Sequence, residues 1–135
     1  MYQKYAHLLG KRTTYASDLN RVGRQHFGQR WGGVLARDTL PAPGHMKFYV
    51  VNTDVSTGGG VHWLAAMDVD GKRYFNDPLG MIGAEQRRQL ERLHPDAVFA
   101  DLDNEQEKHE KDCGVRALVA LEIGLRCGLD EYLAL

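Results

Sequence analysis

Four polar residues stand in an order that suits catalysis by a cysteine nucleophile: His62, Asp77, Gln106 and Cys113. In such chemistry a thiolate attacks an acyl carbon, an imidazole moves the proton, a carboxylate orients the imidazole, and an amide donates to the oxyanion. We expect Cys113 to be the nucleophile, His62 the base, Asp77 the orienting acid and Gln106 the oxyanion donor.

Cys113 stands directly before an apolar run over residues 115–125, which predicts a helix that begins at or beside the cysteine. Unpaired N–H groups and the positive end of the helix dipole would lower the thiol pKa below about 8.5. Gly114 leaves one flank of the sulfur open to a substrate. The run is apolar on nearly every side, which predicts a buried central helix. A free cysteine is also commonly a small buried apolar residue, and that alternative stays open.

His62 follows a glycine run and precedes an apolar strand that ends at Asp70-Gly71, a strong hairpin signal. Asp77 falls just past the second strand of that hairpin. His62 lies eight residues before Asp70 and Asp77 six after Gly71, so the two can meet at one end of adjacent strands. A carboxylate there would fix the imidazole tautomer and stabilise the imidazolium. The alternatives are a hydrogen-bonded histidine at a strand start and a turn aspartate before Pro78.

Gln106 precedes Cys113 by seven residues in a polar stretch over residues 104–112. A loop of that length can fold back so that the glutamine amide and the Cys113 N–H donate to one oxyanion. The alternative is a solvated glutamine in a charged loop.

The joint order of these residues resembles the adenovirus-type maturation protease, in the cysteine peptidase clan that also contains the SUMO-specific proteases. The resemblance covers about residues 47–127. It is carried by Val51-Asn52-Thr53, Thr57 to Trp63 (TGGGVHW), Asp77-Pro78-Leu79-Gly80, Gln106 and Cys113-Gly114. It implies that His62, Asp77, Gln106 and Cys113 hold the four catalytic roles named above.

Two departures from the adenovirus-type pattern limit what the resemblance implies. The adenovirus enzymes have Glu where this chain has Asp77, whereas the SUMO proteases use Asp. The adenovirus enzyme is activated by a peptide that is disulfide-linked to a cysteine upstream of the oxyanion glutamine. The comparable region around Pro95 has no cysteine, and Cys127 follows the nucleophile, so disulfide capture of an activating peptide is not supported.

Substrate preference follows from the resemblance, which implies cleavage at Gly-Gly or Gly-x-Gly sites in viral structural precursors. We expect Gly59, Gly60 and Trp63 to contact substrate, since glycines permit close backbone approach and an indole gives a flat wall. Trp31 either lies near the cleft or packs in the core. Three other functions stay open: a deconjugating isopeptidase for ubiquitin-like proteins, an acyltransferase on the same thioester, and a catalytically relic virion or DNA-associated module.

The charge is divided unevenly along the chain. Residues 1–50 carry a net charge of +6, and residues 51–135 carry −7. The basic part includes Lys11, Arg12, Arg21, Arg24, Arg30 and Arg37. This basic third predicts possible DNA binding along a phosphate backbone, and the alternative is a solvated helix face.

Length and composition predict one domain over residues 1–135, because a chain that is 43% apolar and 26% charged can bury a sizeable core. We expect no signal peptide and no membrane span. Two cysteines without a disulfide framework indicate a reducing, intracellular compartment, in the virion or host nucleus if the protein is viral. We expect neither metal nor cofactor, apart from a possible activating peptide or DNA, because no paired ligand spacing occurs.

The elements that must position these residues predict an α+β fold, a small mixed sheet packed on helices with the nucleophile at the start of a buried one. Besides the hairpin and the helix at Cys113, the pattern predicts four elements and one loop. They are a helix over Ser17 to Phe27, a loop over Trp31 to Gly44, a strand over Lys47 to Asn52, a helix over Ala84 to Leu93 and a strand over Ala97 to Leu102.

Overall fold

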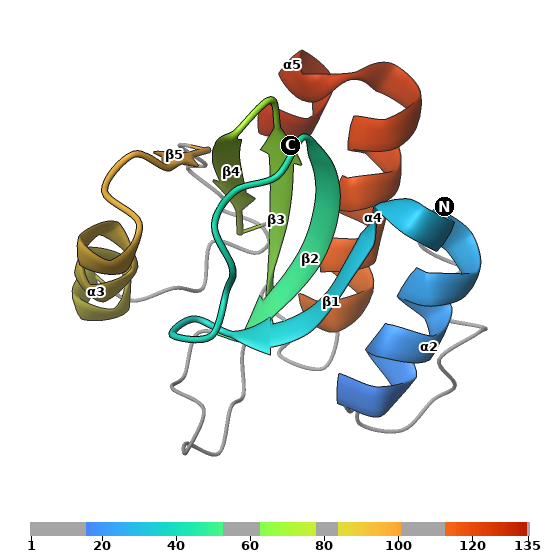
Figure 1. Ribbon diagram of the computed structural model, residues 1–135, viewed down its shortest axis with the longest axis horizontal. Helices are drawn as coiled ribbons and strands as arrows, with labels where there is room; N and C mark the ends of the chain where they lie inside the picture. Colours follow the sequence, from blue (N-terminus) through green and yellow to red (C-terminus); the bar gives the residue numbers. More distant parts are fainter. Residues whose placement is uncertain (1–15, 53–62, 78–83, 101–112, 135) are drawn as a thin grey trace.

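A five-stranded mixed sheet lies at the centre of the protein, with helices on both of its faces (Figure 1). The computed structural model describes residues 16–52, 63–77, 84–100 and 113–134. The elements in chain order are α2 (Ala16–Phe27), η1 (Gly28–Arg30), β1 (Trp31–Ala36), β2 (Met46–Asn52), β3 (Trp63–Val69), β4 (Lys72–Asn76), α3 (Ala84–Leu93), β5 (Val98–Phe99), α4 (Cys113–Cys127) and α5 (Leu129–Leu133). The α+β class predicted from the sequence is confirmed.

The strands are ordered β1-β2-β3-β4-β5 across the sheet. The central pairs β2–β3 and β3–β4 are antiparallel, and the outer pairs β1–β2 and β4–β5 are parallel. Strand β3 is buried from Trp63 to Asp68, because it has a strand on each side and helices over both faces. Such burial explains why its sequence is a nearly continuous apolar run.

The β3–β4 hairpin turns at Asp70 and Gly71, as predicted. Both residues have left-handed backbone angles, with φ of 50° and 84°. Two central residues with positive φ are typical of the hairpin turn whose twist matches that of the flanking strands, and Asp-Gly is a favoured pair for it. The turn fixes the register in which Val69 lies opposite Lys72 and Ala65 opposite Asn76.

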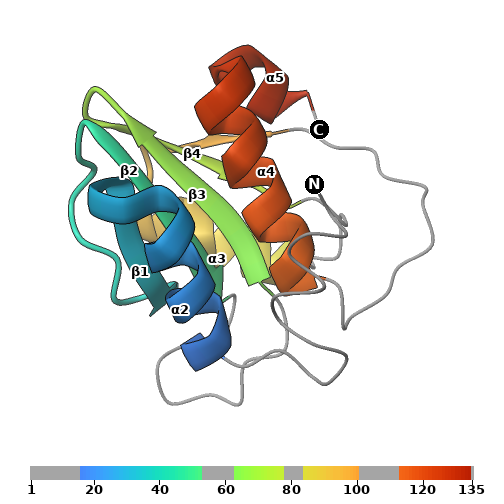
Figure 2. The same ribbon diagram turned by 90° about the vertical axis from the view of Figure 1, so that its right-hand side faces the viewer.

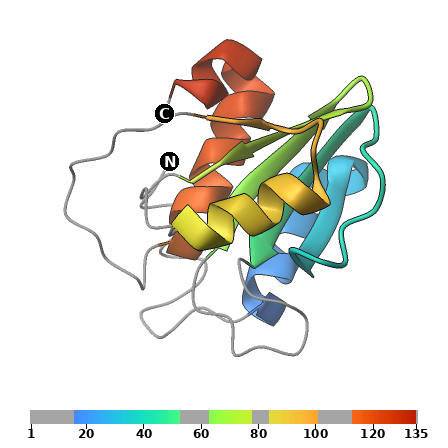
Figure 3. The same ribbon diagram turned by 90° about the vertical axis from the view of Figure 1, so that its left-hand side faces the viewer.

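The two faces of the sheet carry separate cores. Helices α2 and α4 cover one face and α3 covers the other (Figures 1, 2 and 3). The α4-side core contains Leu19, Val22, Phe27, Trp31, Phe48, Val50, Trp63, Ala65, Met67, Val115, Ala117, Leu118, Ala120, Leu121 and Tyr132. The α3-side core contains Tyr49, Val51, Leu64, Ala66, Phe75 and Leu90. Alternation along β2 and β3 divides the side chains between these two cores.

Strand β1 lies where the sequence predicts a loop, so that prediction is wrong. The strand pairs in parallel with β2, and residues 37–45 return the chain to the start of β2. Its glycines weaken the strand signal, but one of them is required by packing: a Cβ on Gly32 would lie 2.1 Å from the Tyr49 ring. Tertiary contact with Tyr49 therefore overrides local propensity here.

The remaining element predictions hold with small changes of boundary. Helix α2 begins one residue before the predicted Ser17, β2 begins at Met46, and α3 has the predicted bounds. Strand β5 is limited to Val98–Phe99, shorter than the predicted strand, whose last two residues lie outside the described part of the chain.

Candidate functional site

Helix α4 begins at Cys113, as the sequence predicts. The first turn of α4 and the first residues of β3 lie at the same end of the sheet (Figures 1 and 2). Val115 and Trp63, near these two starts, belong to the same buried core. Because the first backbone N–H groups of a helix lack helical partners, an anionic group at this end is stabilised.

The helix that carries Cys113 is anchored along its length. Ala117, Leu118 and Leu121 are at most 1% exposed, so α4 is a buried element packed on β2 and β3. A Cβ on Gly124 would lie 2.8 Å from the Met67 sulfur, which shows how closely the helix approaches the sheet. Such packing fixes the position of the Cys113 backbone, which is what a nucleophile at a helix start requires.

Asp77 directly follows the last residue of β4 and is half-buried. Since Asn76 lies opposite Ala65 in an antiparallel ladder, Asp77 lies beside the N-terminal part of β3. It lines a small cavity of about 30 Å³ on the α3 side of the sheet, together with Leu64, Phe75 and Arg87.

The described residues bring together only part of the predicted site. His62, Gln106, Gly59 and Gly60 lie outside them. Asp77 lines the α3 side, whereas α4 packs on the opposite face. A base that contacts both Asp77 and Cys113 would therefore have to lie at the end of the sheet, where β3 begins. That is where the sequence places His62, and the convergence of the four residues stays a prediction.

Both tryptophans pack in the α4-side core, and each is 9% exposed. Trp31 stacks on Phe27 with ring centroids 5.8 Å apart and donates from Nε1 to Asn20 Oδ1 at 2.8 Å. Of the two positions that the sequence left open for Trp31, the cleft and the core, the structure therefore shows the core. Trp63 begins β3 and packs in the same core, and its contact with substrate stays a prediction.

Sequence reasoning missed the polar anchor that holds the end of β4. Asn76 donates from Nδ2 to the Tyr132 carbonyl at 2.6 Å, and the Tyr132 hydroxyl donates to the Tyr74 carbonyl at 2.9 Å. Burial raises the pKa of Tyr132 well above 10.0, so the hydroxyl keeps its proton. These bonds join α5 to β4 immediately before Asp77. No periodicity signals them, because the two segments are 56 residues apart.

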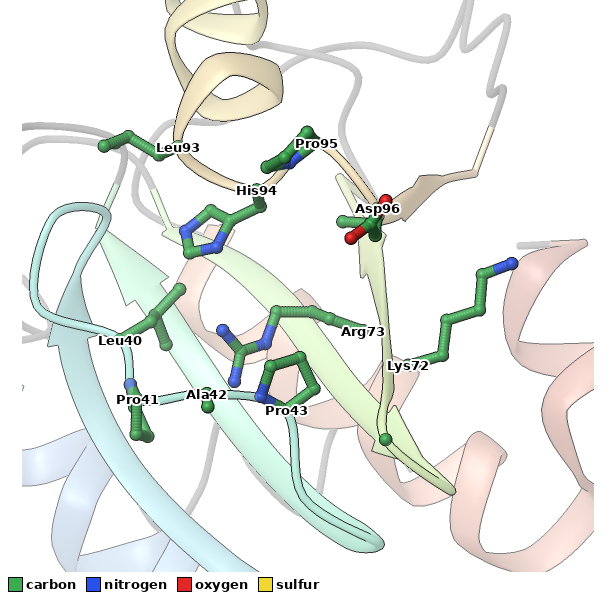
Figure 4. Close-up of a pocket in the computed structure, with 12 residues that line it drawn as sticks. Leu40, Pro41, Ala42, Pro43, Lys72, Arg73, Leu93, His94, Pro95 and Asp96 are labelled. Atoms are coloured by element: carbon green, nitrogen blue, oxygen red, sulfur yellow. The ribbon is translucent and has the colours of Figure 1, made fainter.

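A larger pocket of about 260 Å³ opens on the α3 side of the sheet (Figure 4). Three segments form it: the loop before β2, the start of β4 and the turn after α3. Its lining residues are Leu40, Pro41, Ala42, Pro43, Gly71, Lys72, Arg73, Leu93, His94, Pro95, Asp96 and Ala97. It contains none of the predicted catalytic residues.

A buried ion pair forms the floor of this pocket. Arg73 donates from Nε to Asp68 Oδ1 at 2.8 Å and from Nη2 to Oδ2 at 2.9 Å, and both residues are at most 1% exposed. The backbone N–H of Gly44 also donates to Asp68, at 3.1 Å. The guanidinium lies over the Tyr49 ring, 5.1 Å from its centroid. The pair thereby fastens the loop before β2 to the β3–β4 hairpin.

His94 lines the same pocket and is half-buried. Its Nε2 lies 3.2 Å from the Arg37 carbonyl, and its ring lies 5.4 Å from that of Phe75. Burial lowers the pKa of His94 from its ordinary 6.5. The Arg37 carbonyl opposes the shift, the Arg73 charge adds to it, and Asp68 opposes it.

Replacing His94 by glutamine is expected to flatten the dependence of stability on pH. The folded state binds the His94 proton more weakly than the unfolded state does, so stability is complete above pH 6.5 and falls as the pH drops below it towards the folded pKa. Urea unfolding of both proteins at several pH values in this window checks the expectation. Equal slopes for the wild type and His94→Gln would contradict it.

No protein-family model matches the chain, and no curated protein matches it. Within the described part of the chain, no group of three or more His, Cys, Asp or Glu residues is placed to hold a metal ion. No helix in those segments is long and apolar enough to cross a membrane.

Proposed function

We propose that the protein is a cysteine endopeptidase that cleaves Gly-rich sites, of the Gly-Gly or Gly-x-Gly kind, through a thioester acyl-enzyme. The observation that carries this proposal is the start of the buried helix α4 at Cys113, at the end of the sheet where β3 begins. His62 directly precedes β3 in the sequence. A cysteine at a helix start beside a histidine is an arrangement suited to an activated thiolate.

In the proposed mechanism His62 takes the thiol proton and Cys113 attacks the scissile carbonyl. A tetrahedral oxyanion forms and accepts hydrogen bonds from the Gln106 amide and the Cys113 N–H. Protonated His62 then gives its proton to the leaving amine, which leaves a thioester on Cys113. Water, deprotonated by His62, hydrolyses the thioester and restores the thiol. Asp77 holds the imidazole and stabilises its protonated form.

The same proposal includes a specific type of peptidase fold and a biological role. A mixed sheet with a buried helix that starts at the nucleophile supports an adenovirus-type or SUMO-protease-type peptidase fold. The substrates would be viral structural precursor proteins, and the site of action would be the virion or the host nucleus. The absence of a cysteine near Pro95 argues that any peptide activator binds without a disulfide.

DNA is the proposed partner of the basic third of the chain. Arg21 and Arg24 on α2 and Arg30 in η1 are exposed. Cationic side chains on one surface attract a phosphate backbone, and the resulting affinity falls steeply with salt. DNA would then raise the local concentration of enzyme on DNA-bound substrates.

Incubation with Gly-Gly and Gly-x-Gly peptides, with and without DNA, tests the proposal. Mass spectrometry is expected to show cleavage after glycine and an acyl or probe adduct on Cys113. Cys127 is a matched internal control, because it is an exposed thiol at the other end of the same helix. Cleavage by the Cys127→Ser variant should equal that of the wild type. A Cys113 no more reactive than Cys127, with no cleavage under either condition, would refute the proposal.

A further inference from the structure

Beneath the lining of the pocket at Arg73 lies a buried hydrogen-bond donor that lacks a well-aligned partner among the described residues. Arg73 Nη1 is buried and makes no well-aligned hydrogen bond with any described residue, although the Tyr49 hydroxyl also interacts with the Arg73 guanidinium. The other two guanidinium nitrogens both donate to Asp68. A buried polar group without a partner costs free energy of folding, so a partner from outside the chain would relieve that cost.

The surroundings of this donor are mostly apolar. Figure 4 shows the Arg73 guanidinium between Leu40, Pro43 and His94, with the Lys72 side chain extending away from it. Leu93, which also lines the pocket, is 48% exposed and is one of the two large apolar side chains exposed within the described segments. A pocket with largely apolar walls and a few placed polar groups is typical of small-molecule sites.

The charges around the pocket favour an uncharged ligand. Asp68 already neutralises the Arg73 guanidinium through two hydrogen bonds. Burial lowers the pKa of His94, so its ring is neutral at pH 7. Asp96 adds a carboxylate to the lining, and this carboxylate repels anions. A bound anion would therefore lose its hydration without gaining a free positive charge in return.

We propose that this pocket binds a small neutral molecule whose apolar body lies against Leu40, Pro43 and Leu93 and whose carbonyl oxygen accepts a hydrogen bond from Arg73 Nη1. A volume of about 260 Å³ admits one compact aromatic or branched aliphatic ketone or amide. The site is independent of the proposed peptidase, because it contains none of His62, Asp77, Gln106 and Cys113.

Binding must move the rim of the pocket slightly. Nη1 is covered by neighbouring atoms, so the ligand oxygen reaches it only when the loop over Leu40–Pro43 shifts outward. Gly44 follows that loop and is bonded to Asp68 at 3.1 Å. Ligand binding is therefore expected to change the NMR signals of the Ala42 and Gly44 amides and of Arg73 Nε–Hε together.

Three probes of similar size separate the contributions of shape, charge and hydrogen bonding. Acetophenone has an apolar ring and a neutral acceptor, benzoate carries a charge, and toluene has no acceptor. In titrations followed by NMR, acetophenone is expected to give saturable shifts of the Arg73, Ala42 and Gly44 signals, with a dissociation constant in the millimolar range typical of so small a ligand. Toluene is expected to bind at least about tenfold more weakly, because it lacks the acceptor and a hydrogen bond to a charged donor contributes roughly that factor or more. Benzoate is expected to bind at least about tenfold more weakly because its carboxylate loses hydration without meeting a free positive charge.

Two variants complete the test. Arg73→Lys keeps a cation for Asp68 but removes the Nη1 donor, and it is expected to weaken acetophenone by about tenfold without affecting toluene. Ala42→Trp fills the mouth from an exposed position and should abolish binding even if the lysine variant fails to fold. Benzoate or toluene binding as tightly as acetophenone would overturn the proposal. So would the absence of saturable shifts with acetophenone, or undiminished binding to the Ala42→Trp variant.

Discussion

Replacing Arg73 by methionine is expected to lower the free energy of unfolding by about 3–5 kcal/mol, the usual cost of removing one partner of a buried ion pair. Methionine fills much of the arginine volume but cannot donate to Asp68. The aspartate is 0% exposed and would keep one described hydrogen bond, from the Gly44 N–H at 3.1 Å. An anion left in that position loses its hydration without compensation. Urea unfolding at pH 7 measures the loss.

Two further variants separate this explanation from a simple loss of contacts. Arg87 pairs with Glu91 at 3.1 Å on the surface, where the two side chains are 42% and 49% exposed, and Arg87→Met is expected to cost at most about 1 kcal/mol. The double variant Asp68→Leu/Arg73→Met removes both charges and should be more stable than Arg73→Met alone. An Arg73→Met loss no larger than that of Arg87→Met would show that the pair does not hold the fold.

The buried pair of Asp68 and Arg73 is a feature that the pattern of the sequence does not predict. Asp68 and Arg73 lie directly opposite one another across the hairpin, which the Asp70-Gly71 signal does predict. Alternation along a strand assigns both residues to one face, but it does not reveal that charged residues on that face are covered. Their burial depends on the loop before β2, whose course is decided by contacts distant in the sequence. Local patterns therefore predicted the hairpin and missed the ion pair inside it.

Strand β1 was missed for a related reason. Its glycines and the prolines that follow it are typical of a loop, and a parallel neighbour usually needs a longer crossover with a helix. Here residues 37–45 make the crossover, and hydrogen bonds from Asp70 N to His45 O and from Gly71 N to Gly44 O hold its end. Helix α4, in contrast, begins at Cys113, within the predicted start at or beside that residue, because an apolar run of that length has few alternatives. The strongest local signals in the sequence therefore belong to the β3–β4 hairpin and to helix α4, the two elements that the candidate site needs.

The sequence predicts the strands and the helix that carry the candidate site, but it does not predict the contacts among the site residues. Buried residues hold three segments in place: the end of β4, the start of β3 and the start of α4. The apolar residues of these segments are recognisable in the sequence. His62 and Gln106 stand in glycine-rich and polar segments, which carry no periodic pattern from which their conformation could be predicted.

Cys113→Ala is expected to abolish peptide cleavage, with a loss of at least about 10⁴-fold in kcat, because no other group can form the thioester. The fold should persist, since alanine has the highest helix propensity and the buried residues Val115, Ala117, Leu118 and Leu121 of α4 are unchanged. Circular dichroism and the urea midpoint check the fold, and product formation by mass spectrometry checks activity. Cys127→Ser serves as the matched control at the other end of the helix and should retain full activity.

The two cysteine variants together decide what the start of α4 does. Loss of cleavage in Cys113→Ala with an unchanged urea midpoint would assign the chemistry to the thiol rather than to the integrity of the helix. Cleavage retained in Cys113→Ala would remove Cys113 from the mechanism, whatever the reactivity of its thiol. A thiol that reacts fast with a probe while the protein cleaves no Gly-rich peptide would instead favour an isopeptidase or an acyltransferase, since both need the same activated cysteine but a different acyl donor. The helix start would then still be a catalytic site, with its substrate determined by surfaces other than those near Trp63.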